Sequence, residues 1–163
     1  MAMAILSWLI AIPVLGFCTG LRAMTPIAVL CWFAFLGHLP VDGTWGFWTT
    51  RLVSVLIFTA LALGEYIGDK LPSTPARTAP FPLIARLFFG GLIGALIATA
   101  LVGSAIEGAL LGVAGAALGA FAGFHLRTCA VFQSQGWPDW RVAIVEDVIA
   151  ITASIFALSI VTG

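Results

Sequence analysis

The sequence predicts an all-α polytopic integral membrane protein, one transmembrane domain over residues 1–163 built as a bundle of about five spanning helices. Hydrophobic residues make up 61% of the chain and charged residues only 9%, whereas a soluble domain usually carries roughly 25% charged residues. Several apolar runs approach the roughly 20 residues that a helix needs to cross a bilayer. The alternative, a soluble protein with an unusually apolar core, would have too few charges to cover its surface.

Charge and cysteine content exclude several classes of partner. Seven basic and seven acidic residues give a net charge of zero, so no basic patch favours nucleic acid as a partner. Cys18, Cys31 and Cys129 lie in apolar surroundings without a C-x-x-C pattern, so we expect no metal, no cofactor and no disulfide framework. The apolar N-terminus lacks a positive leading region, which favours a retained span over a cleaved signal.

The first apolar run, residues 4–37, is too long for one straight span. It is interrupted between Gly16 and Pro26 by glycines, threonines and Arg22, which together indicate a break. We predict a first span over 4–22, a bend, and a shorter helix over 26–37 that is re-entrant or lies at the interface. Broken backbone at membrane depth is tolerated only where it lines a cavity or is covered by protein.

Four further spans follow, separated by turn-forming segments. Residues 38–50 carry tryptophans suited to the headgroup level, residues 72–82 are a proline-rich loop, Gly103-Ser104 is a short turn and residues 133–140 are a polar turn. The predicted spans are 51–71, 81–102, 105–126 and 141–161.

Five spans would put the two termini on opposite sides of the membrane. The loops after the second and fourth spans then share a side, and they are flanked by the basic residues Lys70, Arg77, Arg86, Arg127 and Arg141. The positive-inside rule therefore predicts a bacterial inner-membrane protein with a cytoplasmic N-terminus and an external C-terminus.

Glycines recur at a spacing of four in the third and fourth spans. Small residues on one helix face let two backbones approach closely, which favours packing within the chain or a homo-oligomer interface, and both remain open. The glycines are Gly90, Gly94, Gly108, Gly112, Gly115, Gly119 and Gly123.

A weak similarity between the first two spans and the last two spans favours an inverted repeat. Arg22 ends the first span as Arg127 ends the fourth, and Arg51 opens the second as Arg141 opens the fifth. The first and fourth spans would cross in opposite directions, as in many transporters.

A pair of carboxylates near the end of the second span is the main candidate site. Glu65 and Asp69 are four residues apart, so they share one helix face. Carboxylates at this depth are costly and usually face a partner or a wet cavity. Either they form a cation, proton or polar-solute site, or they are paired structurally with Arg22, Arg86, Arg127 or Arg141.

A second pair, Glu146 and Asp147, lies about one and a half turns into the fifth span. Adjacent helical residues point about 100° apart, so at most one of them faces a given partner squarely. Arg22 and Arg127 are the expected counter-charges, although Arg22 would otherwise snorkel to the outer interface or capture an anionic headgroup. No nucleophile–base set, zinc-protease motif or phosphate-binding loop is present in the sequence, so we do not expect an enzyme.

The string Glu65-x-x-x-Asp69-Lys70-x-Pro72, followed by Arg86 and its glycines, resembles a bacterial family of small membrane proteins known as a domain of unknown function. Gly20-x-Arg22 and the segment from Glu146 to Ala150 fit the same family, so the resemblance covers nearly the whole chain. After Pro72 the family often has Gly-x-Asp, where this chain has Ser73-Thr74-Pro75. The resemblance implies a multi-span membrane protein and no particular activity.

These observations favour a small channel or transporter for an ion or a small polar solute. Membrane lipids, the solute and a second copy of the chain are the expected partners. The six candidate site residues are Glu65, Asp69, Glu146, Asp147, Arg22 and Arg127. A membrane scaffold or assembly partner is the alternative, and an intramembrane lipid-modifying enzyme is the least favoured.

Overall fold

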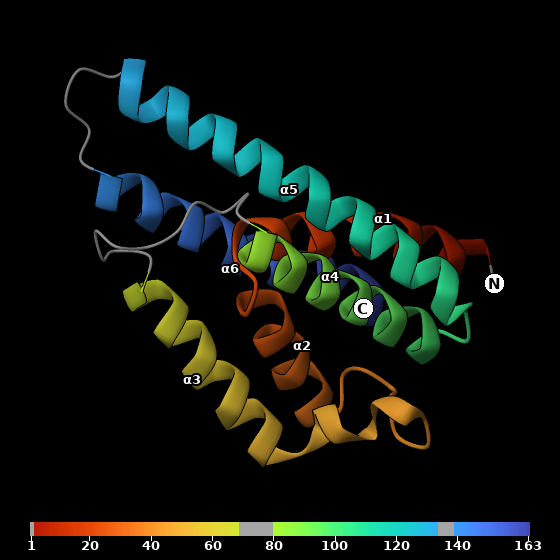
Figure 1. Cartoon of the computed structure of the whole chain (residues 1–163). Coiled ribbons are helices and arrows are strands. Elements are labelled where there is room, and N and C mark those ends of the chain that lie inside the picture. Colours follow the sequence, from red (N-terminus) through yellow and green to blue (C-terminus); the bar gives the residue numbers. More distant parts are fainter. Residues whose placement is uncertain (1, 69–79, 134–138) are drawn as a thin grey trace.

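The computed structural model describes residues 2–68, 80–133 and 139–163, and in these ranges the protein is all-α (Figure 1). Six α-helices and one short 3-10 helix, η1, follow one another along the chain. They are α1 (Ala2–Leu21), α2 (Thr25–Phe35), η1 (Trp45–Thr50), α3 (Leu52–Gly68), α4 (Pro80–Ala100), α5 (Ala105–Gln133) and α6 (Asp139–Thr162).

Three helical segments are long and apolar enough to cross a membrane: Pro80–Ala100, Ala105–Leu126 and Arg141–Thr162. The apolar segments Ser7–Leu21, Thr25–Phe35 and Leu52–Gly68 are shorter. Since a helix rises about 1.5 Å per residue, the three long segments match a hydrocarbon layer about 30 Å thick. They indicate a multi-pass membrane protein.

The predicted break in the first apolar run falls between α1 and α2. The last bond of α1 runs from the Arg22 N–H to the Cys18 carbonyl (2.8 Å), and the Ala28 N–H bonds to the Met24 carbonyl (3.1 Å). Pro26 lies in the first turn of α2, where a missing N–H costs no helical bond. The chain therefore changes direction at Ala23 and Met24.

Helix α2 begins at the break and runs back along the bundle. Its start bonds to the end of α3 through Thr25 and Tyr66 (2.7 Å), and further along Trp32 Nε1 donates to Thr59 Oγ1 of α3 (3.2 Å). The two helices are therefore antiparallel. Beyond α2, Trp45 of η1 donates to Thr99 near the end of α4 (3.2 Å), so the chain has reached the opposite end of the bundle.

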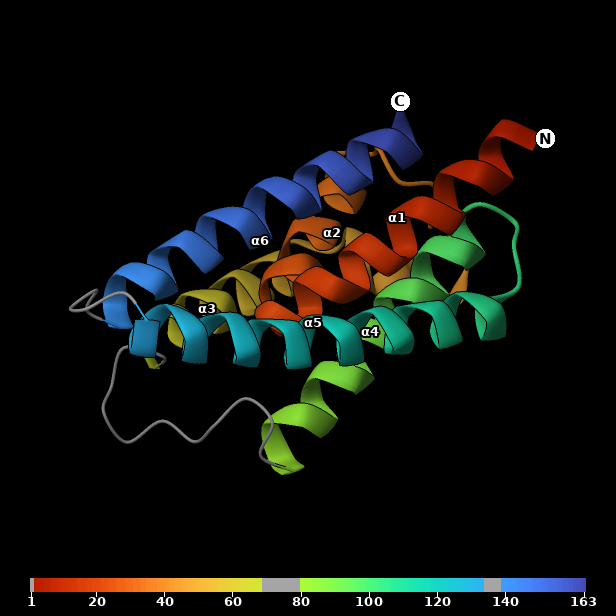
Figure 2. The ribbon, with the colours of Figure 1, turned by 90° about the horizontal axis from the view of Figure 1, so that it is seen from above.

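Because α2 adds a crossing, both termini lie at the same end of the bundle (Figure 2). This differs from the five-span expectation of termini on opposite sides. It also changes the relation between α1 and α5, which run in the same direction, because Gly16 lies against Gly115 and Gly20 against Gly119. The opposite crossing that the inverted-repeat hypothesis requires for these two segments is therefore not observed.

The regularly spaced glycines pack helices inside the chain. Gly94 of α4 lies against the Gly108 backbone of α5, and Gly90 lies against Gly112. Gly115 and Gly119 on the same helix approach the α1 backbone near Pro13 and Phe17. Helix α5 thus fits between α1 and α4 at backbone contact distance, which supports the packing alternative for these glycines.

The apolar core lies where α1, α2, α4 and α6 meet. Ile12, Leu30, Leu96 and Leu158, one from each helix, are fully buried there. Helix α3 lies at the edge of this core, packed against α2 and η1, and of its side chains only Val55 and Ala62 are buried. Most of α3 is therefore exposed or half-buried, and its last turns carry Glu65, a residue of the candidate site described next.

Candidate functional site

Charged side chains from four helices meet at the end of the bundle where α1 breaks. We call this set the charge cluster: Arg22 after α1, Glu65 of α3, Arg86 of α4, and Glu146 and Asp147 of α6. Arg22 is fully buried and Arg86 is 5% exposed. Ionised groups this far from water are tolerated only when they are paired and hydrogen-bonded.

Arg22 is paired with the carboxylates of α6. Its Nε lies 2.6 Å from Oδ1 of Asp147, and its Nη2 lies 4.0 Å from Oε2 of Glu146. Nη2 also donates to the Ala143 carbonyl at 3.2 Å. The sequence alternative of a snorkelling arginine at an outer interface does not fit, because this guanidinium is buried inside the bundle beside carboxylates.

Glu65 joins the end of α3 to the break between α1 and α2. The Ala23 N–H donates to its Oε1 (2.8 Å) and the Met24 N–H donates to its Oε2 (2.9 Å). These two N–H groups precede the first turn of α2, where a helix leaves donors without intrahelical partners and where negative charge is favourable. Arg86 Nη2 lies 3.9 Å from Oε1 on the other side.

Tyr66 connects the two halves of the charge cluster. Its hydroxyl shares a 2.7 Å hydrogen bond with Thr25 Oγ1, and the Arg22 guanidinium carbon lies 5.8 Å from the centre of its ring. A cation at this distance from an aromatic face is attracted to it. Tyr66 therefore contacts both the Arg22 guanidinium and the start of α2.

A pocket of about 420 Å³ opens between α3 and α4 beside the charge cluster, and we call it the α3–α4 pocket. Within the described ranges its charged lining residues are Glu65 and Arg86, with Ala23 and Met24 from the break. The remaining lining residues are Ala60, Leu61, Gly64, Phe81, Pro82 and Ala85. It resembles ligand pockets in general, which are mainly apolar with a few converging polar groups.

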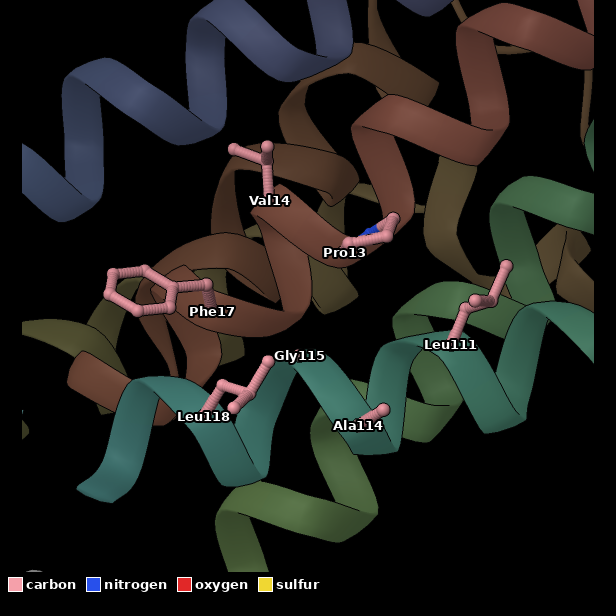
Figure 3. Close-up of a pocket in the computed structure, with 7 residues that line it drawn as sticks. All are labelled: Pro13, Val14, Phe17, Leu111, Ala114, Gly115 and Leu118. Carbon is pink, nitrogen blue, oxygen red and sulfur yellow. The ribbon is translucent and has the colours of Figure 1, made fainter. Parts of the chain in front are cut away.

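A second pocket, of about 400 Å³, lies between α1 and α5 (Figure 3). It is lined by Pro13, Val14 and Phe17 on α1 and by Leu111, Ala114, Gly115 and Leu118 on α5. Since these side chains carry no charge, the pocket offers a ligand only apolar contact.

Four of the six residues that the sequence singled out, Glu65, Glu146, Asp147 and Arg22, lie in the charge cluster. Asp69 lies outside the described residues. Arg127 belongs to α5, but its side chain is outside the described part. Within the residues that the structure describes, no group of three or more His, Cys, Asp or Glu side chains could hold a metal ion.

Sequence reasoning named Arg86 only as one possible structural partner of Glu65, and it missed two members of the site entirely. One is Tyr66, and the other is the pair of backbone N–H groups at Ala23 and Met24 that Glu65 accepts from. The proline at position 26 was a usable signal, because a helix that restarts there must expose donors just before it. Which distant carboxylate would accept from them was not visible in the sequence.

Comparison with curated proteins and with solved structures gives no match. A family model, described as Domain of unknown function (DUF4126), matches residues 9–161. This match includes every residue of the charge cluster and every lining residue of both pockets. The chain therefore belongs to the DUF4126 family.

Proposed function

We propose that this protein is a small membrane transporter or channel for an ion or a small polar solute. The observation that carries the proposal is the position of Glu65, whose carboxylate contacts the broken backbone, Arg86 and the α3–α4 pocket at once. In many secondary transporters the binding site is built from interrupted helices whose free backbone groups face charged ligands. Here the interruption, the charges and the pocket coincide.

The chemistry of the cluster suits reversible binding. Glu65 accepts from two N–H groups, but a carboxylate has about four acceptor positions, so a solute donor or cation has room to bind from the pocket side. The carboxylates of Glu146 and Asp147 contact Arg22, whose guanidinium carbon lies 5.8 Å from the centre of the Tyr66 ring. A solute passing from the pocket to α6 would meet alternating negative and positive groups.

The topology favours an external position for both termini. Arg22, Arg86 and Arg141 lie at the broken end of the bundle, whereas Arg51 opens α3 at the other end. The positive-inside rule therefore places the broken end in the cytoplasm of a bacterial inner membrane. In this arrangement six helical segments cross or partly cross the bilayer, in place of the five expected from the sequence.

The experiment that tests transport is solute flux in proteoliposomes, followed with pH-sensitive and cation-sensitive dyes. Wild type is compared with Glu65→Gln, which keeps the shape and loses the charge, and with the control Glu107→Gln, which changes an exposed carboxylate in the first turn of α5. We expect flux to fall at least about tenfold in Glu65→Gln, as for a lost charge interaction of about 1.4 kcal/mol, and to persist in the control. Equal flux in all three proteins would contradict the proposal.

A scaffold or assembly partner is the second candidate, and one observation favours it. The cluster charges lie beside one another, Arg22 by Asp147 and Arg86 by Glu65, as expected of ion pairs that only hold helices together. No flux in folded, inserted wild type, together with one stoichiometric membrane partner, would support this alternative. The proposed homo-oligomer would then need a surface other than the glycine faces of α4 and α5 described above.

A further inference from the structure

Among the residues that the structure describes, the α3–α4 pocket combines a polar floor of one acidic and one basic side chain, Glu65 and Arg86, with an apolar rim. Oε1 of Glu65 and Nη2 of Arg86 lie 3.9 Å apart. The Glu65 side chain is 14% exposed and the Arg86 side chain is 6% exposed. Around them the lining is apolar, and Leu61 and Phe81 on the rim are 47% and 85% exposed. In a membrane-embedded bundle, an exposed apolar rim of this kind is best covered by lipid chains.

The paired charges restrict what the pocket can hold. A ligand with one net charge would add an uncompensated charge to a site of low dielectric, which is costly. A ligand that carries both signs can place an ammonium beside Glu65 and a phosphate beside Arg86, since guanidinium groups bind phosphate well and a carboxylate accepts from ammonium. The charge pattern therefore favours a zwitterion.

The apolar rim indicates that the zwitterion arrives with acyl chains attached. Lipid-facing side chains border the opening on both α3 and α4, and Ile84 and Phe88 continue the exposed apolar surface along α4. Acyl chains can pack there while the headgroup reaches the polar floor. We propose that the α3–α4 pocket binds the headgroup of a zwitterionic, amine-bearing phospholipid that enters sideways from the bilayer.

Gly64 allows a clean test, because it lines the pocket and a Cβ added there meets nothing within 4 Å. Gly64→Phe should place its ring in the pocket from a Cβ that meets no neighbouring atom. Gly68→Phe is the matched control: a Cβ added at Gly68 also meets nothing within 4 Å, and Gly68 does not line the pocket. Leu61→Trp is a second blocking variant on the rim, and all variants are first checked for an unchanged elution profile and melting temperature.

The measurement is lipid binding to the delipidated full chain by native mass spectrometry. The probes are palmitoyl-oleoyl phosphatidylethanolamine, the matching phosphatidylglycerol and dioleoylglycerol. We expect one site that prefers the ethanolamine lipid by about tenfold or more, lost in Gly64→Phe and Leu61→Trp and kept in Gly68→Phe. This readout is independent of flux, so it stands or falls separately from transport.

Three outcomes would overturn the inference. One is equal binding of all three lipids, which would show that the charged floor does not select the headgroup. Another is unchanged binding in both blocking variants. The third is full displacement of the lipid by glycerophosphoethanolamine at equal concentration, which would show that the pocket takes a soluble zwitterion and does not need the acyl chains.

Discussion

Arg22 and Asp147 form an ion pair, with Nε and Oδ1 2.6 Å apart, that ties the end of α1 to a position about two turns into α6. Arg22 is fully buried and the Asp147 side chain is 12% exposed. The pair fixes the last helix of the chain against the first one at the broken end of the bundle. The consequences of removing either charge are therefore sharply different from those of removing both.

Removing one member of this pair should destabilise the protein more than removing both. Arg22→Met or Asp147→Leu alone leaves the other member of the pair buried without its 2.6 Å partner. Breaking a buried pair in this way costs up to about 3–5 kcal/mol, whereas apolar replacement of a whole buried pair is often close to neutral. We expect Arg22→Met/Asp147→Leu to melt at a higher temperature than either single variant in detergent. A double variant that is as unstable as the sum of the single ones would contradict this pairing.

Replacing Glu65 should expose the break between α1 and α2. Glu65→Leu removes both acceptors for the Ala23 and Met24 N–H groups, at about 1–3 kcal/mol for each buried donor left unpaired. Glu65→Gln keeps one acceptor oxygen and should lose less. Hydrogen exchange measured by mass spectrometry on peptides covering residues 22–28 should quicken in the order wild type, Gln, Leu. Identical exchange in all three would show that Glu65 does not hold the break.

Glycine positions at backbone contacts should differ from glycines in open space. A Cβ on Gly94 would overlap the Gly108 carbonyl oxygen, whereas one on Gly64 meets nothing. We expect Gly94→Ala to destabilise the protein by about 1–3 kcal/mol, because α4 and α5 must separate to make room for the methyl group. The melting temperature should fall accordingly. Gly64→Ala should be neutral or stabilise α3 by up to about 1 kcal/mol. The reverse order would mean that α4 and α5 do not pack as described.

The direction of α2 predicts that both termini share one side of the membrane. The test uses epitope tags at each terminus and single cysteines at Asp42 and Arg141 in a chain whose natural cysteines are replaced by alanine. A membrane-impermeant maleimide should reach Asp42→Cys from the side of both tags and Arg141→Cys from the opposite side. An N-terminal tag found on the Arg141 side would restore the five-span layout.

The sequence allowed the helices and the break to be predicted, since both depend on local composition. Apolar runs near the spanning length, bounded by glycine and proline, located α4, α5 and α6 within a few residues, although α5 continues to Gln133, beyond the predicted end at residue 126. The charged residues of the site were visible for the same reason, because a carboxylate or an arginine in an apolar run stands out. Their functional roles stay predictions.

The tertiary structure alone decided how these parts are joined. The 26–37 segment, expected as a re-entrant or interfacial helix, runs back along α3, and this places both termini at one end. Likewise, Arg22 pairs with Asp147, and Glu65, beside Arg86, accepts from the two N–H groups that precede α2. The physical reason is that helix formation depends on neighbours a few residues away, whereas the direction of a short helix and the partner of a buried charge depend on packing between segments more than forty residues apart.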